Sequence, residues 1–527
     1  MDLLTGLNDL KPFFSKFEYL VRVQYVTFDT ILVQQLDRDQ RNLVLSLLSL
    51  KGHFPPQVLC VENINPHWAH VSDLIHFLNI DQSKSLKIDD ELEYLWTSQR
   101  SGFRHLYKLR SAIVNAGETT VTASSDVGDL LLSKSLHTVQ LTFGNWEVSD
   151  KDSWLDRENH LLYFVARKES PLETQLYVIN YDRPEVGDIV KLTTSGYSHG
   201  GIAFNDQRTA FTTVQSSISV PPLGYVYRKP TTDSEQFQFN RVAKLVDNED
   251  SNLDHLNRNF ADEHLPTFAK PELFSYQLKE SGEIVYGLIF KPDFMQAGVK
   301  YPVLLDVYGG PGVQLVSNSY RSVRLLRRHL LASQGYVVCA FDCRGSYHRG
   351  VQFEGHLRNR LGQVEVADQV EVLQWLAATT NYIDINRISV HGWSYGGYLS
   401  LLCYAQRPEI FRLCVAGAPV TNWKLYDTGY TERFLGVPPE KEEQYQAGSV
   451  LSQVSSMPSE ENRLMIIHGM MDENVHFQHT VELIQELIKA GKPYQLQVFP
   501  FERHTLRNQA VREHYLTTML WFLNQHL

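Results

Sequence analysis

The chain has 527 residues, of which 43% are apolar, 21% charged and 11% aromatic, and its formal net charge is −11. A chain of this length exceeds one hydrophobic core, so we expect two or more domains. An acidic chain without a basic stripe argues against a nucleic-acid partner, and apolar runs no longer than a strand argue against a membrane span.

Targeting signals and cysteines point to the same compartment. The N-terminus carries Asp2 and Asp9 where a signal peptide would carry basic residues. The cysteines are odd in number, scattered and mostly within apolar runs, which is typical of free thiols in a reducing compartment. They are Cys60, Cys339, Cys343, Cys403 and Cys414. We therefore expect a cytoplasmic protein.

The first half of the chain, residues 1–265, is predicted to be rich in β-strands. Short alternating runs such as HLLYFVARK and TQLYVINYD recur between turn residues. Leu141-Thr142 and Leu192-Thr193 open two segments about 50 residues apart, and Tyr177 and Tyr227 repeat that offset. This period predicts four-stranded propeller blades, roughly five in this half, with a β-sandwich of accidental spacing as the alternative. The acidic stretch 245–264 is predicted to be a solvated linker or loop.

The second half, residues 266–527, alternates strands with helices. A hairpin is expected at 274–292, turning at Ser281-Gly282. Strands are then predicted at 301–307, 336–341, 388–390, 413–417, 464–469 and 495–499, and helices at 322–335, 363–379, 399–405, 478–490 and 511–526. This alternation predicts a doubly wound, mostly parallel sheet covered by helices on both faces.

Residues 392–396, Gly-Trp-Ser-Tyr-Gly, form a G-x-S-x-G motif between a predicted strand and a predicted helix. A serine on such a sharp turn holds its Oγ out of the sheet, and small residues on both sides let the backbone bend. The N–H groups that follow it begin a helix and can stabilise a developing oxyanion. We therefore predict that Ser394 is a nucleophile, with a plain turn as the alternative.

A serine nucleophile needs a base, and the base needs an orienting acid. In α/β-hydrolases these follow the serine in the order acid, then histidine. Asp472, with Glu473 beside it, comes just after the strand at 464–468, and His504 comes just after the strand at 495–499. The predicted triad is therefore Ser394, Asp472 and His504. Core or surface roles are expected for His391, His468, His476 and His479.

An oxyanion hole needs two hydrogen-bond donors. The backbone N–H of Tyr395 is the first by the geometry of the elbow. The loop after strand 301–307, residues 308–312, is Tyr-Gly-Gly-Pro-Gly and lacks the HGGG pattern of lipases. It places the phenol of Tyr308 at the strand end, where its O–H could donate; packing on Pro311 is the alternative. This chemistry requires no metal or cofactor, and we expect none.

Several segments together resemble the prolyl oligopeptidase family of serine peptidases. They are HGWSYGGYLS, DVYGGPGVQLV, AGAPVTNWKLYDTGYTERFLG, HGMMDENVHFQHT and FERHTLR. The likeness is greatest to the dipeptidyl peptidase branch, and within it to the dipeptidyl peptidases 8 and 9. It is strong over 266–527 and weaker from about residue 100 to 265. The resemblance implies a β-propeller domain at 1–265, an α/β-hydrolase domain at 266–527, and release of N-terminal dipeptides after proline or alanine.

The resemblance also implies roles for individual residues. It gives Ser394, Asp472 and His504 the triad roles and Tyr308 and Tyr395 the oxyanion hole. A flat proline pocket would be lined by Val420, Trp423, Tyr426, Tyr430 and Val475 with the ring of Tyr395, and Asn474 would hold a substrate carbonyl. An aromatic-walled slot suits a rigid pyrrolidine ring. The implied partners are peptides with a free N-terminus and a second copy of the chain, paired through the hydrolase domain.

The sequence departs from the family in one respect. Dipeptidyl peptidases hold the substrate amine with a Glu pair on a propeller segment, whereas the acidic runs here, such as 89–91 and 460–461, have a different context. We therefore expect the chain to begin part-way through the propeller. Two alternatives stay open. One is an oligopeptidase, acylaminoacyl peptidase or esterase of the same fold, and the other is a catalytically impaired form acting as an interaction protein.

Overall fold

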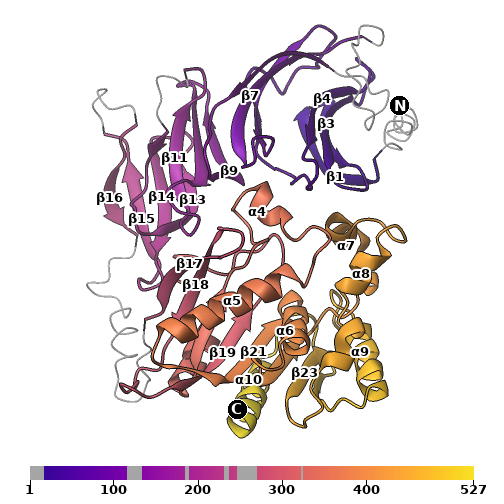
Figure 1. Ribbon diagram of the computed structural model, residues 1–527. Coiled ribbons are helices and arrows are strands. Elements are labelled where there is room, and N and C mark those ends of the chain that lie inside the picture. The colour runs from indigo at the N-terminus through magenta and orange to yellow at the C-terminus, as the bar shows by residue number, and fades with distance from the viewer. Residues whose placement is uncertain (1–16, 116–132, 184–188, 231–236, 246–269, 322–324) are drawn as a thin grey trace. The chain divides into compact units, whose positions relative to one another are not determined.

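The computed structural model describes residues 17–115, 133–183, 189–230, 237–245, 270–321 and 325–527. The chain forms two compact units (Figure 1). The β-sheet unit comprises Met1–Val214, Tyr225–Ala243 and His348–Gln352, and the α/β unit comprises Gln215–Gly224, Lys244–Tyr347 and Phe353–Leu527. The expected domain boundary at 265/266 and most of the acidic stretch 245–264 lie outside the described residues.

The β-sheet unit contains four sheets of four antiparallel strands among its described residues. The first has β1 (Tyr19–Thr27), β2 (Thr30–Leu36), β3 (Asn42–Ser49) and β4 (Gln57–Asn63), and the second has β5 (Ile75–Phe77), β6 (Glu91–Ser98), β7 (His105–Ala112) and β8 (Lys134–Gln140). The third has β9 (Glu147–Asp156), β10 (Leu161–Arg167), β11 (Gln175–Asn180) and β12 (Val190–Lys191). The fourth has β13 (Ser198–Phe204), β14 (Ala210–Ser216), β15 (Leu223–Arg228) and β16 (Asn240–Lys244).

Successive sheets of this unit pack face to face. Leu45 of the first sheet and Trp96 of the second lie in one buried core, while Leu95 of the second and Phe164 of the third lie in another. A sandwich would pair only two sheets, so this chain of cores favours propeller blades. The 50-residue offset is also explained, because Tyr177 and Tyr227 both lie in the third strand of their sheets, β11 and β15.

The structure describes four sheets, whereas the 50-residue period predicts roughly five. The predicted number covers all residues from 1 to 265, and residues 1–16 and most of 245–264 lie outside the described residues.

The α/β unit contains an eight-stranded sheet in the order β17-β18-β20-β19-β21-β22-β23-β24. The strands are β17 (Glu272–Gln277), β18 (Ile284–Phe290), β19 (Tyr301–Val307), β20 (Val337–Phe341), β21 (Ile383–Trp393), β22 (Leu413–Gly417), β23 (Leu464–Gly469) and β24 (Gln495–Phe499). The predicted hairpin is β17–β18, which pairs antiparallel, and the strands from β20 to β24 are parallel. All six predicted strands are therefore confirmed.

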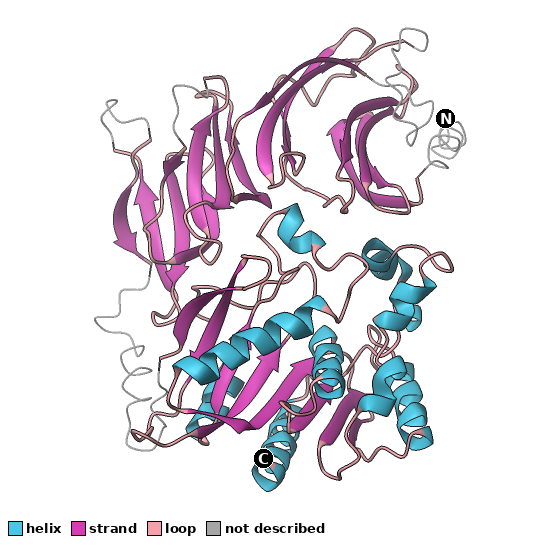
Figure 2. Ribbon diagram, in the orientation of Figure 1, coloured by secondary structure: helices cyan, strands magenta, loops and turns pink. Residues whose placement is uncertain are grey.

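In chain order, helices lie between the later strands of this sheet and after the last one, and Figure 2 shows helices in cyan. They are α3 (Leu326–Ser333), α4 (Val351–Gly355), α5 (Val364–Thr379), α6 (Tyr395–Gln406), α7 (Thr428–Leu435), α8 (Glu442–Ala447), α9 (Gln478–Lys489) and α10 (Gln509–His526), with 3-10 turns at Trp423–Leu425 and Leu451–Ser456. The five predicted helices are present, although the expected start of α3 at residue 322 lies outside the described residues. The short helices α4, α7 and α8 were not predicted.

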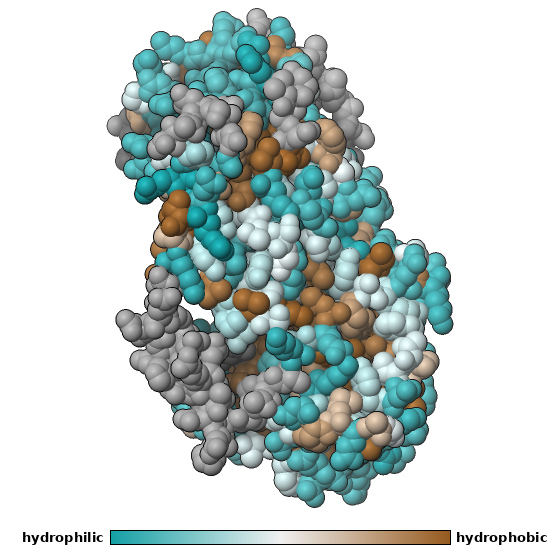
Figure 3. Space-filling model, turned by 90° about the vertical axis from the view of Figure 1, so that its left-hand side faces the viewer, coloured by the Kyte–Doolittle hydropathy of each residue, from teal (hydrophilic) through white to brown (hydrophobic). Residues whose placement is uncertain are grey.

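Among the described residues, no helix combines the length and the apolar character that crossing a bilayer requires. Figure 3 shows one face of the molecule, on which hydrophilic and intermediate residues cover most of the surface and hydrophobic areas lie between them.

Candidate active site

Ser394 lies at the bend between the end of β21 and the beginning of α6. Its φ is 63° and its ψ is −119°, a strained conformation for a residue with a side chain. Two backbone hydrogen bonds hold it there. The Ser394 N–H donates to the carbonyl of Gly417 at 2.9 Å, and the Ser394 carbonyl accepts from the N–H of Tyr398 at 3.0 Å. The serine therefore projects from the carboxyl edge of the sheet.

The two glycines of the motif are required by close backbone contacts. A Cβ on Gly392 would lie 2.3 Å from the carbonyl oxygen of Gly396. A Cβ on Gly396 would lie 2.3 Å from the carbonyl oxygen of Val307, at the end of β19. Because these neighbours are backbone atoms, they cannot rotate away, so any larger residue would displace the elbow.

Asp472 and His504 form a hydrogen-bonded pair beside this edge. Asp472 follows β23 and His504 follows β24, and His504 Nδ1 lies 2.7 Å from Asp472 Oδ2. The other oxygen of Asp472 accepts from the N–H groups of Asn474, at 2.9 Å, and Val475, at 2.8 Å. Burial alone would raise the pKa of Asp472, but hydrogen bonds from His468 and His504 hold it well below its usual value. An ionised Asp472 makes Nδ1 of His504 the protonated nitrogen and leaves Nε2 to accept a proton.

Two neighbouring side chains support this pair. His468, for which only a structural role was predicted, places Nε2 at 3.2 Å from Asp472 Oδ2 and Nδ1 at 2.8 Å from the hydroxyl of Thr480. It thus helps to fix the carboxylate, a role that its position at the end of β23 could have indicated. Glu473 is exposed and accepts the backbone N–H of His504 at 3.3 Å, so it supports the histidine loop.

Trp393 connects the loop of His504 to the elbow. Its indole N–H donates to the backbone carbonyl of His504 at 2.9 Å. This contact joins the residue before Ser394 to the residue expected to act as its base. Within the part of the chain that the structure describes, no hydrogen bond is formed by Ser394 Oγ, and such bonds are often long until substrate is present.

The rings of Tyr308 and Tyr395 both lie close to Gly310, in the loop after β19. Their ring centroids are 6.1 Å apart, and a Cβ on Gly310 would lie 2.8 Å from the Tyr308 ring and 3.0 Å from that of Tyr395. Burial raises the pKa of the Tyr308 phenol, so its O–H stays protonated and can donate. The N–H of Tyr395 begins α6 and has no partner inside the helix. Both donors expected for an oxyanion hole are therefore available.

An aromatic cluster lies next to the elbow. Trp423 is almost fully buried and contacts Tyr395 at 5.6 Å, Tyr426 at 5.9 Å and Tyr430 at 5.9 Å between ring centroids, the last pair being stacked. Asp427 caps α7 by accepting the N–H of Tyr430 at 2.8 Å, which fixes one wall of the cluster. Val420 and Val475, the aliphatic residues expected in the same pocket, are buried.

Asn474 lies at the rim of this cluster and is exposed. Its Oδ1 accepts from the hydroxyl of Tyr426 at 2.7 Å. The carbonyl side of the amide is therefore engaged, and its N–H₂ group is the side that can donate to a substrate carbonyl.

The remaining histidines and acidic runs have other environments. His391 is buried between Asp306, at 2.8 Å, and Tyr515, at 2.5 Å. His479 accepts the N–H of Thr421 at 3.1 Å, and burial lowers its pKa to about 4. His476 is exposed. In the acidic runs, Glu91 is paired with Arg110 and Glu460 with Arg463.

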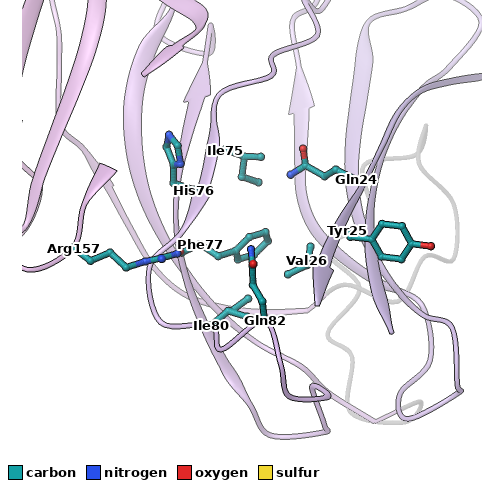
Figure 4. Close-up of a pocket in the computed structure, with 9 residues that line it drawn as sticks. All are labelled: Gln24, Tyr25, Val26, Ile75, His76, Phe77, Ile80, Gln82 and Arg157. Atoms are coloured by element: carbon teal, nitrogen blue, oxygen red, sulfur yellow. The ribbon is translucent and has the colours of Figure 1, made fainter. Parts of the chain in front are cut away.

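A separate small pocket, of about 130 Å³, lies in the β-sheet unit and is drawn in Figure 4. None of its lining residues belongs to the predicted site. His76 bonds to Ser153 at 2.8 Å, Arg157 donates to the carbonyl of Phe77 at 2.8 Å, and burial lowers the pKa of His76 to about 4. The side chains of His76 and Arg157 are thus engaged within the protein. Among the described residues, no group of three or more His, Cys, Asp or Glu side chains could hold a metal ion.

Comparison with known families agrees with this geometry. Residues 321–527 match the sequence model of the prolyl oligopeptidase family. These residues belong to the prolyl oligopeptidase family. Residues 5–222 match the N-terminal region of dipeptidyl peptidase IV. The fold is thus that of β-propeller blades followed by an α/β-hydrolase domain, as expected.

Individual relatives are similar over most of the chain. Dipeptidyl peptidase 8 of Mus musculus is 38% identical over 517 residues, which are 93% of this chain and 55% of that protein. Dipeptidyl peptidase 8 of Homo sapiens is 37% identical over 521 residues, with the same coverage. A probable dipeptidyl-aminopeptidase B of Coccidioides posadasii is 28% identical over 495 residues, 92% of this chain and 48% of that protein. The chain therefore spans about half the length of the curated relatives it matches.

Proposed function

We propose that this chain is a serine exopeptidase that releases N-terminal dipeptides with proline or alanine in the second position. The observation that carries the proposal is the aromatic cluster of Tyr395, Trp423 and Tyr430 directly beside Ser394. Rigid aromatic walls match the flat face of a pyrrolidine ring, and a small alanine side chain also fits such a slot. The names of the relatives and the family of residues 321–527 support the same reaction class.

In the proposed first step, Ser394 Oγ attacks the carbonyl carbon of the second substrate residue. The serine proton passes to Nε2 of His504, and the imidazolium is stabilised by the ionised Asp472. The oxyanion accepts hydrogen bonds from the Tyr308 hydroxyl and the Tyr395 N–H. His504 then donates its proton to the leaving amine, the C–N bond breaks, and an acyl ester remains on Ser394.

In the second step, water takes the place of the departed amine. His504 accepts a proton from the water, whose oxygen attacks the ester carbonyl and forms a second oxyanion in the same hole. Collapse of this intermediate breaks the ester bond, returns the proton to Ser394 Oγ and releases the dipeptide. Asn474 is proposed to donate to the carbonyl of the first substrate residue during both steps.

The test is hydrolysis of a Gly-Pro reporter amide by the wild-type chain and by Ser394→Ala. We expect the substitution to lower kcat by about 10⁴-fold or more, as removal of a triad member does. A fluorophosphonate probe should label Ser394 in the wild type only. Equal turnover by the two proteins would contradict the assignment of the nucleophile.

A second candidate is an oligopeptidase or acylaminoacyl peptidase of the same fold. It is favoured by the acidic runs of the sequence, since Glu91 and Glu460 are already paired with arginines and are not available to a substrate amine. Free-amine and N-blocked Gly-Pro reporters compared side by side distinguish the two. Preference for the blocked substrate would replace the first proposal, and absence of any labelling of Ser394 would favour a non-enzymatic role.

We propose further that the chain resides in the cytoplasm and pairs with a second copy. All five cysteines are buried and free, which suits a reducing compartment. On the α/β unit, Val481, Ile488 and Trp521 are exposed apolar residues of α9 and α10 that a second copy would cover. Cell fractionation and light scattering after gel filtration test these two proposals.

A further inference from the structure

Behind the catalytic elbow lies a buried carboxyl group that the proposed mechanism does not use. Glu365, in the first turn of α5, is fully buried. Its two oxygens accept the N–H of Gly362 at 3.0 and 2.9 Å, and Oε1 also accepts the hydroxyl of Tyr395 in a short hydrogen bond. The Cβ of Glu365 lies 3.7 Å from the position that a Cβ on Gly309 would occupy. Glu365 therefore adjoins both segments that carry the expected oxyanion donors.

The contact with Tyr395 matters because of where Tyr395 lies. It directly follows Ser394, its N–H is an expected oxyanion donor, and its ring is 6.1 Å from that of Tyr308 and 5.6 Å from that of Trp423. The hydroxyl bonded to Glu365 is at the far end of this ring. Anchoring that hydroxyl fixes the ring and, through it, the first residue of α6.

The surroundings of Glu365 shift its pKa towards neutral pH. Asp368 lies one turn further along α5 and has its own partner in Arg344, at 2.7 Å. Other titratable groups that interact with Glu365 are Tyr395, Tyr398, Tyr430, Cys343 and Cys403. Among the described residues, no ion pair is formed by Glu365 itself. Burial, with a smaller contribution from Asp368, raises the pKa of Glu365 to about 7.

We propose that Glu365 is a positioning residue whose ionised carboxylate holds the Tyr395 hydroxyl and thereby aligns the oxyanion hole for attack by Ser394. This inference rests on the proposed function and deepens it. Hydrogen bonds to an ionised acceptor are roughly twice as strong as neutral ones. When the pH falls and Glu365 becomes protonated, the charge-assisted bond is replaced by a neutral one, and Tyr395 is held less firmly.

The experiment compares Glu365→Gln with the wild type across the pH range, using the Gly-Pro reporter. The ratio of their kcat/KM values removes the contribution of His504, which is common to both. We expect the kcat/KM of the wild type to be about ten times that of the variant above roughly pH 8, which corresponds to about 1.4 kcal/mol. Below roughly pH 6 the ratio should fall to about one. A ratio that does not change with pH would overturn the inference, because a merely structural loss would be the same throughout.

Two further variants make the result specific. Glu371→Gln is the matched control, since Glu371 lies on the same helix and accepts the hydroxyl of Tyr276 at 2.9 Å, away from the elbow. We expect its ratio to stay near one at every pH. In Tyr395→Phe, which lacks the hydroxyl, adding Glu365→Gln should have no further effect on the pH profile. An unchanged effect in that background would show that Glu365 does not act through Tyr395.

The rate of fluorophosphonate labelling of Ser394 separates this inference from the proposed function. If the wild type is labelled but does not cleave the reporter, the proposed specificity is wrong, and the labelling-rate ratio still tests Glu365. If the wild type cleaves and its ratio to Glu365→Gln is flat, only the Glu365 inference is wrong. If Ser394 is neither labelled nor active, both are wrong.

Discussion

At the scale of single residues, Tyr308 is the proposed oxyanion donor whose contribution can be measured most directly. Tyr308→Phe keeps the ring that packs near Tyr395 and removes only the hydroxyl. Loss of one oxyanion donor should lower kcat by on the order of 10²-fold with little change in KM, because the bond is made mainly in the transition state. Steady-state kinetics on the Gly-Pro reporter measure this. A loss confined to KM would place Tyr308 in ground-state binding instead.

Glu365 also makes the stability of the protein depend on pH. Its folded pKa of about 7 lies above the ordinary value of 4.5, so the native state binds its proton more tightly than the unfolded state. Between these two pH values the native state carries more protons, and the free energy of unfolding therefore falls as pH rises. Protonated Glu365 contributes about 3 kcal/mol to the free energy of unfolding below pH 4.5, and this contribution is lost by pH 7.

Urea unfolding of the wild type and Glu365→Gln at several pH values checks this prediction. The difference in unfolding free energy between the two proteins should shift in favour of the variant as the pH is raised through this window. Because the amide of the Glu365→Gln variant cannot ionise, a constant difference would mean that the carboxyl does not titrate in the native protein.

At the scale of elements, the elbow depends on contacts between β19, β21 and α6. We predict that Gly396→Ala destabilises the protein by about 3 kcal/mol or more, since the added methyl would meet the Val307 carbonyl at 2.3 Å. Thermal unfolding measures the loss. Gly200→Ala is the control, because nothing lies within 4 Å of its Cβ position. Equal stability of the two variants would show that the elbow has room to adjust.

Trp393 joins the elbow to the loop after β24, and its role can be separated from its packing. Trp393→Phe retains an aromatic ring beside Tyr515 and removes the N–H that donates to His504. We expect kcat to fall by about tenfold, because His504, the proposed base, is held less well against Ser394. Trp375→Phe, on α5, is the control, since Trp375 packs only against Phe274 and Tyr276 in the aromatic contacts described. A similar loss in both variants would argue against a specific role.

The elements that could be predicted are those whose pattern is local. The strands of the α/β unit are short apolar runs bounded by turn residues, and each of them was found within a few residues. Helix α7 was not predicted because its eight residues are too few to show a helical period. The prediction that Ser394, Asp472 and His504 lie close together rests on their positions just after predicted parallel strands. Parallel strands bring their carboxyl ends to one edge of the sheet.

Contacts between distant parts of the chain could not be predicted in the same way. The sequence contains no sign that Trp393 would bond to the His504 carbonyl, or that the carboxyl of Glu365 would accept the hydroxyl of Tyr395. Each depends on side-chain directions that are set by packing across several elements. The same limit applies to Glu147, which lies buried next to His348 at 3.6 Å although the two are far apart in sequence.

At the scale of the whole molecule, residues 348–352 are assigned to the β-sheet unit although they follow β20 of the α/β sheet. Val351 lies in the core shared by the first two β-sheets, and its N–H donates to the carbonyl of Gly102 at 2.9 Å. We predict that Val351→Ala destabilises this unit by about 2 kcal/mol through the cavity it leaves. Hydrogen exchange of β6 and β7 should become faster, whereas Val242→Ala, at a 52% exposed position, should leave it unchanged.

The position of residues 348–352 also has a consequence for how the protein is made. During synthesis the strands of the first two sheets leave the ribosome more than 200 residues before Val351 does. Until then their shared core lacks one of its members, and a carbonyl of the turn at Gly102 lacks its donor. We therefore expect nascent chains arrested before residue 348 to be digested in the first two sheets by added protease, and chains arrested well after residue 352 to resist it.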